Sequence, residues 1–192
     1  VSDLRIEKNY YGVLLFESGG IIAEKLDVEY CYTAFFAQNV INVSVSDTHI
    51  SRSNNGIFAE NIHNVYLNNI SISNASDVGI IADCVDSLYI RDLNASNVST
   101  VLSIDDCDNV YVANVAAYNS STGIAINNTV EVSIVNITYI NVDVGIYASS
   151  VGEFFCEKIN ATRSEYFLYL RYVDLCVLTD LWATNSSCLL YT

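Results

Sequence analysis

The 192-residue chain contains no proline and no methionine, and only eight of its residues are lysine or arginine. Proline cannot donate a hydrogen bond to a β ladder, so its absence favours a chain that is strand almost throughout. The few cations stand beside 22 acidic residues, and the resulting net charge of −14 argues against nucleic acid and anionic membrane surfaces as partners. No apolar run approaches the roughly 18 residues of a membrane helix, so we expect no membrane span.

The first residue is valine rather than methionine, which favours a mature chain from which a signal segment has been removed. Six cysteines and repeated N-x-S/T sequons point the same way, toward an oxidising, extracellular location at a cell surface or in a sheath. Asn94 and Asn160 are the sequon residues that we expect to carry glycans.

The sequence repeats with a period of 22 residues. "GIIADCVDSLYIRDLNASN" at Gly79–Asn97 has the same apolar and polar pattern as "VLSIDDCDNVYVANVAAYN" at Val101–Asn119. Stepping backward from Gly79 keeps the pattern if one extra residue is placed within Ser73–Asp77. The period covers residues 1–192 as one domain of about 8.7 coils.

Each repeat holds three short runs in which apolar residues alternate with polar ones, such as Ile80 and Ala82, then Leu88 and Ile90. Alternation with period two is typical of β-strands with one buried face. Three short strands per 22 residues, each pairing with its copy one repeat away, predict an all-β parallel β-helix, a solenoid. Neither end of the sequence shows a helical cap pattern.

One phase of the repeat is an asparagine column, which we expect to point inward at a turn. Asparagine tolerates the left-handed conformation of a sharp turn, and stacked amides can hydrogen-bond along a ladder. The column comprises Asn74, Asn97, Asn119, Asn141 and Asn185.

With this repeat length, strand count and asparagine ladder, the sequence resembles the right-handed parallel β-helix repeat, or pectate-lyase-like, superfamily. The resemblance implies a right-handed coil, but it does not specify a function, because one fold hosts many activities. Enzymes of that superfamily pair calcium-binding acids with a basic cluster, or carry Gly-His-Gly and Arg-x-Lys motifs, and this sequence has neither. We therefore expect a protein that is not an enzyme. Its composition and repeat type are similar to those of archaeal surface-layer and sheath proteins.

Five acidic residues gather on adjacent coils. Glu60, Asp83 and Asp105 share a phase, and Asp106 and Asp108 lie close by. Adjacent coils lie about 4.8 Å apart, so the carboxylates are expected to form one patch. Such a patch would hold calcium, the only cofactor that the sequence suggests, or supply paired carboxylates for glycoside hydrolysis. The alternative is a solvated acidic turn.

Two outward phases are apolar or aromatic along many coils, and contiguous exposed patches of this kind mark association surfaces. We expect the chain to bind copies of itself through them, side by side and also end to end. The predicted assembly residues are Leu14, Phe36, Phe58, Ile81, Tyr147, Tyr169 and Tyr191 on one face, and Tyr66, Tyr89, Tyr111 and Phe155 on another.

The cysteines divide into three pairs. Cys84 and Cys107 lie on neighbouring coils and are predicted to form a disulfide. Cys156 and Cys176 form a second disulfide candidate, with buried free thiols as the alternative. Cys31 and Cys188 lie near opposite ends of the stack and are predicted to bond to other chains.

The sequence thus predicts an extracellular structural protein that assembles into a surface layer, sheath or fibre. The alternatives are a β-helix that binds or cleaves carbohydrate at the Glu60, Asp83 and Asp105 face, and a β-helical fragment of an adhesin.

Overall fold

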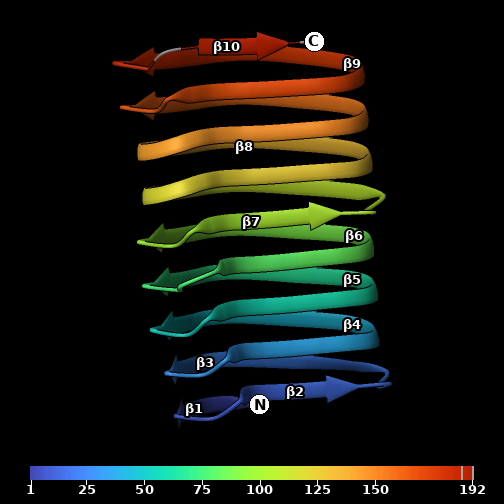
Figure 1. Ribbon diagram of the computed structural model, residues 1–192. Coiled ribbons are helices and arrows are strands. Elements are labelled where there is room, and N and C mark those ends of the chain that lie inside the picture. The colour runs from blue at the N-terminus through green and yellow to red at the C-terminus, as the bar shows by residue number, and fades with distance from the viewer. Residues whose placement is uncertain (187, 192) are drawn as a thin grey trace.

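Backbone hydrogen bonds between copies of the repeat, one coil apart, build the structure into a single stack (Figure 1). The computed structural model describes the backbone of residues 1–186 and 188–191 and the side chains of residues 1–186. Its strands are β1 (Ser2–Glu7), β2 (Tyr11–Phe16), β3 (Gly20–Glu29), β4 (Thr33–Ser51), β5 (Asn55–Ser73), β6 (Val78–Ser96), β7 (Thr100–Asp105), β8 (Asn109–Thr162), β9 (Tyr166–Thr184) and β10 (Cys188–Tyr191).

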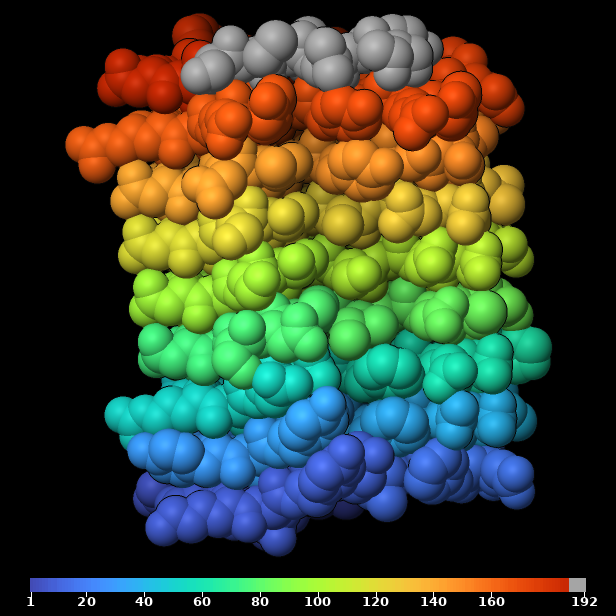
Figure 2. All heavy atoms as spheres, in the orientation of Figure 1, coloured from blue at the N-terminus to red at the C-terminus, as the bar shows by residue number. Residues whose placement is uncertain are grey.

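The register confirms the predicted repeat. Val13 pairs with Phe35, 22 residues further along the chain, whereas Ile57 pairs with Ile80 across the extra residue. All of the strand pairs are parallel, and about eight turns follow one another from the N-terminal to the C-terminal end. The described part of the chain contains no helix, so none is long and apolar enough to cross a membrane. The predicted all-β parallel solenoid is therefore confirmed, and Figure 2 shows its coils as successive bands of side chains.

Each coil has three straight sides. We call Gly79–Asp83 and its register partners the first side, Ser87–Arg91 the second side and Leu93–Ser96 the third side. The corner after each side takes the same number. Many strands run through a corner without a break, as at Val40, which pairs with Ile62 just beyond the first corner. Others end at a corner, as β4, β5, β6 and β9 do at the third corner. The three predicted short strands are therefore straight segments of longer ladders.

Every corner is built on a residue in the left-handed conformation, with φ between 46° and 59°. The conformation costs an ordinary L-residue about 1–2 kcal/mol, and asparagine and aspartate tolerate it best. The first-corner residues are Glu17, Asn39, Asn61, Cys84, Asp106, Asn128, Ser150 and Tyr172. The second-corner residues are Asp3, Lys25, Asp47, Asn69, Asp92, Asn114, Asn136, Lys158 and Asp180. The third-corner residues are Lys8, Tyr30, Arg52, Asn74, Asn97, Asn119, Asn141, Arg163 and Asn185.

The predicted asparagine ladder forms at the third corner over Asn74, Asn97, Asn119 and Asn141, whereas Arg163 separates Asn185 from it. Asn97 Nδ2 donates to Asn74 Oδ1 at 3.2 Å, Asn119 donates to Asn97 at 3.4 Å, and Asn141 donates to Asn119 at 3.0 Å. The predicted inward direction was wrong, because these side chains are exposed. The left-handed residue carries its side chain outward, and the residue after it, such as Val98, faces the core.

The core runs along the axis of the stack and is filled by the inward apolar columns. Phe35, Phe154 and Tyr139 are among its largest fully buried side chains. Tyr139 stands where neighbouring coils have alanine, and its ring packs beside Gly123 and Gly145. Burial raises the pKa of the Tyr139 hydroxyl well above its ordinary value. This hydroxyl has no hydrogen-bond partner.

Candidate functional site: an acidic first corner

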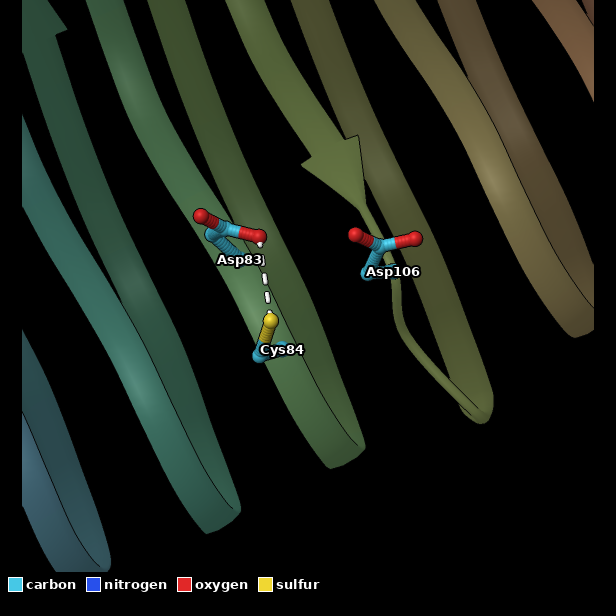
Figure 3. Close-up of side chains that lie close together, drawn as sticks. All are labelled: Asp83, Cys84 and Asp106. Atoms are coloured by element: carbon cyan, nitrogen blue, oxygen red, sulfur yellow. Dashed lines mark hydrogen bonds between the residues drawn. The ribbon is translucent and has the colours of Figure 1, made fainter.

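Three polar side chains converge at the first corner. Asp83 ends the first side of its coil in β6, and Cys84 is the left-handed residue that follows it. Asp106 occupies the same left-handed position one coil further on, just after β7 (Figure 3). Their potential ligand atoms all lie within 4.8 Å of one another. The register places them together because equivalent corner residues of adjacent coils stack.

The register also confirms that Glu60, Asp83 and Asp105 form one column. Their side chains have different partners, however. Glu60 accepts a hydrogen bond of 2.7 Å from Gln38 Nε2, and Asp105 accepts one of 3.2 Å from Asn128 Nδ2.

The structure therefore brings together only part of the predicted acidic set. Asp83 and Asp106 belong to the tight cluster, whereas Asp108 is exposed outside it. Cys84, which sequence reasoning assigned to a disulfide, completes the cluster instead.

Two groups at this corner, the Asp105 carboxyl and the Cys84 thiol, have raised pKa values. Partial burial, followed by the charges of Asp106 and Asp83, raises the pKa of Asp105. The Cys84 thiol donates to Asp83 Oδ1 at 3.4 Å, and this hydrogen bond is the main reason that its pKa is raised as well. Calcium prefers six to eight oxygen ligands. The cluster itself supplies two carboxylates and a thiol, fewer oxygen ligands than calcium prefers, and calcium binding here stays a prediction.

The predicted Cys84–Cys107 disulfide is absent, and both thiols are free. Cys84 is exposed at the corner, whereas Cys107 is one position further along its own coil and faces the core. A shift of one residue at a corner thus turns one sulfur outward and the other inward. Burial raises the pKa of the Cys107 thiol to about 12.

The other cysteines also differ from the disulfide predictions. Cys156 and Cys176 are free thiols. Cys156 is buried, as the alternative interpretation had it, whereas Cys176 is half-buried. Burial raises the pKa of Cys156 to about 12. Cys31 was predicted to reach another chain, but its side chain is buried at the third corner, where Sγ donates to Glu29 O at 3.6 Å. The side chain of Cys188 lies outside the described residues.

The predicted assembly residues form two aromatic and aliphatic columns on the surface. On the first side, Phe36 stacks on Phe58 with ring centroids 5.0 Å apart, and Tyr147 stacks on Tyr169 at 5.3 Å. The side chain of Tyr191, assigned to the same column, lies outside the described residues.

On the second side, Tyr66 stacks on Tyr89 at 5.2 Å, and Tyr111 follows at 6.4 Å with its ring tilted. Sequence reasoning identified both columns. It missed the shallow hollow of about 250 Å³ beside the three tyrosines, which Asn68 and Arg91 also line.

Comparison with known proteins agrees with this architecture. A family profile described as right handed beta helix region matches residues 1–100, just over half of the chain. The chain belongs to this right-handed β-helix family. No curated protein and no solved structure matches it. The β-helix fold occurs in enzymes such as pectate lyases and in proteins without catalytic activity, so membership alone does not assign an activity.

Proposed function

We propose that the protein is an extracellular structural β-helix that binds copies of itself side by side to build a surface layer, sheath or fibre. The observation that carries the proposal is the apolar column along the first side. Its described outward residues are Leu14, Phe36, Phe58, Ile81, Ser103, Ala125, Tyr147 and Tyr169.

This column is continuous and uncharged from one coil to the next. Leu14 is 46% exposed, and the stacked rings of Phe36 and Phe58 keep their outer surfaces partly open. The column before it, which includes Thr33 and Asn55, is also uncharged, although these two side chains are buried. The column after it carries Glu60, Asp83 and Asp105, so the first side is apolar along its middle and acidic along one edge. Burial of contiguous apolar surface against a second copy would remove it from water, the main driving force for association.

Glycans at the predicted acceptors would not obstruct the first side. Asn94 and Asn160 are exposed and lie on the third side of their coils, in register with Ser71 and Trp182 respectively. A glycosylated third side and an apolar first side would let one chain face both solvent and neighbouring chains. This arrangement supports an extracellular assembly.

Placing a lysine at Phe58 tests the proposal. We expect the wild-type chain to form assemblies well above 21.2 kDa in sedimentation velocity, and Phe58→Lys to shift the distribution toward smaller species. The reason is that a charge buried between apolar faces has no partner. Ala116→Lys is the matched control, because Ala116 is also half-buried but lies on the third side. A wild-type chain that stays monomeric at high concentration would refute the proposed self-assembly.

A second candidate function, cleavage of a glycosidic bond, is favoured by the raised pKa of Asp105. Retaining glycosidases use two carboxyl groups about 5 Å apart, one of them protonated. Asp83 and Asp105 are register partners on adjacent coils, which are about 4.8 Å apart. Asp105 would be the acid and Asp83 the nucleophile.

If the chain hydrolyses a polysaccharide, Asp105→Asn should lower the release of reducing ends at least about 100-fold while the assembly state is unchanged. Asp108→Asn, an exposed residue outside the cluster, is the control. Wild-type protein that releases no reducing ends from a polysaccharide panel would eliminate this candidate.

A further inference from the structure

The second side carries little charge over its N-terminal coils, although the protein has a net charge of −14. It presents three outward columns, which we call leading, central and trailing. The leading column includes Asn64, Ser87, Asn109, Glu131, Glu153 and Leu175; the central column includes Tyr66, Tyr89, Tyr111, Ser133, Phe155 and Val177; the trailing column includes Asn68, Arg91, Ala113, Val135, Glu157 and Thr179. In the three coils that begin these columns, from Asn64 to Ala113, Arg91 is the only charged column member.

The central column is an aromatic platform with hollows beside it. Tyr66 and Tyr89 are 46% and 44% exposed. A second hollow, of about 280 Å³, lies between Tyr111 and Glu131, and a third of the same volume lies beside Phe155 and Val177. The central column therefore offers aromatic rings and, next to them, hollows into which the rings of a second copy can fit.

We infer that the second sides of two copies pack face to face, related by a two-fold axis that is parallel to the strands. The axis lies midway between the coil of Tyr111 and the coil of Ser133, so the two stacks run in opposite directions. Under this symmetry each outward column meets its own column in reverse coil order. Tyr89 then lies opposite Phe155 of the second copy, and Tyr66 lies opposite Val177.

The charges select this arrangement. Arg91 lies opposite Glu157 of the second copy, and at the second corner Asp92 lies opposite Lys158. Glu157 and Lys158 pair at 2.5 Å in their own chain but keep 43% and 58% of their side-chain surface exposed, so both can meet an added partner. Each contact occurs twice in a two-fold dimer.

The remaining acids of the second side meet uncharged residues. Glu131 lies opposite Asn109, and Glu153 lies opposite Ser87. No two like charges face each other among the described residues of the three columns from Asn64 to Thr179.

Neighbouring arrangements are less favourable. A shift of the axis onto the coil of Tyr111 puts Arg91 opposite Val135 and loses the charge pair. A shift onto the coil of Ser133 puts Glu131 opposite its own copy. A two-fold axis parallel to the stack instead sets Glu153 against Glu157. Like-charge juxtapositions cost several kcal/mol at an interface, so complementarity fixes the register.

The contact area is sufficient for a specific but modest interface. Six coils at about 4.8 Å and five residues at about 3.3 Å cover roughly 1,000 Å² when both copies are counted, the lower bound for a specific complex. Two sheets packed face to face are typically about 10 Å apart with their strands nearly aligned, as this symmetry requires. The inferred dimer deepens the proposed function, because it names the symmetry and register of one contact. It rests on the proposed binding between copies of the chain, but not on the first-side contact.

A charge reversal tests the register. We expect Arg91→Glu and Glu157→Arg each to raise the dimer dissociation constant at least about tenfold, since each creates two like-charge contacts. The double variant Arg91→Glu/Glu157→Arg restores opposite charges in both places. Its dissociation constant in sedimentation equilibrium should return to within about threefold of the wild-type value. A double variant as weak as either single variant would overturn the inference.

The measurement is best made in the Phe58→Lys background, where the first-side contact is weakened. If both contacts exist, this background leaves a dimer that the charge reversals dissociate and the double reversal restores. If Phe58→Lys changes nothing but the reversal pattern holds, the first-side proposal fails and the second-side dimer stands. A Phe58→Lys chain that remains monomeric at high concentration, while the wild type assembles, overturns the second-side dimer alone.

Discussion

Replacing Gly123 with alanine is expected to lower the free energy of unfolding by about 3 kcal/mol. The new Cβ would lie closer than 3.0 Å to the carbonyl oxygen of Gly145 and to the ring of Tyr139, and real Cβ atoms essentially never approach so closely. The oxygen belongs to the backbone of the next coil, and the ring is fully buried, so neither can yield without moving its coil. Overpacking a filled core therefore strains two coils at once.

Gly19→Ala is the matched control, because a Cβ at Gly19 meets no atom within 4 Å. Urea unfolding monitored by circular dichroism gives both values. A Gly123→Ala chain as stable as Gly19→Ala would show that the stack relaxes around Tyr139 far more readily than a close-packed core does.

The second large effect is expected at the third corner, where Asn97→Val should cost about 3 kcal/mol of unfolding free energy. Valine is poorly suited to the φ of 54° at this position, and the left-handed conformation alone costs about 1–2 kcal/mol. The substitution also removes the two amide hydrogen bonds that Asn97 makes with Asn74 and Asn119, each worth about 0.5–1.5 kcal/mol.

Asn97→Gly separates these two causes, because glycine keeps the left-handed conformation and loses only the hydrogen bonds. Its expected cost is about 1 kcal/mol. Both variants should be produced without glycosylation, since Asn97 begins a sequon. Equal costs for valine and glycine would mean that the corner does not depend on backbone conformation.

The solenoid could be predicted from the sequence because each position of the coil recurs every 22 residues as a column of chemically similar side chains. Ile80, for example, belongs to an inward column whose members are apolar in every coil, so a single substitution hardly weakens the pattern. Stacking pairs each strand with its own copy, and the period alone therefore fixed the register. The same reasoning located the extra residue at the third corner of the coil that ends before Val78.

The corners were harder to predict because their geometry is set by the stack rather than by residue type. Asparagine marked the third corner, but Cys84 at the first and Lys158 at the second adopt the same left-handed conformation. Neither residue has an intrinsic preference for it. Column-by-column inspection for aspartate and asparagine would have indicated the second corner, where Asn69 donates to Asp47 at 2.7 Å and Asn136 donates to Asn114 at 2.8 Å.

The cysteine and acidic predictions failed in part for the same reason. Alternation gives the direction of a side chain along a straight side, but it loses phase at each corner. Cys84 and Cys107 differ by one position there, so one is exposed and the other buried. The position of Asp108, beyond the corner and outside the cluster, could not be read from its spacing to Asp105.

The extra residue between Ser73 and Val78 shows where this architecture accepts added length. The strands on both sides of it keep their pairing, since Ile72 lies beside Ala95 and Ile80 beside Leu102. Growth of the third corner therefore leaves the interior undisturbed, while growth along a side would reverse which residues point inward. We therefore expect this corner to accept inserted loops with new binding specificities, whether they arise in evolution or by protein engineering.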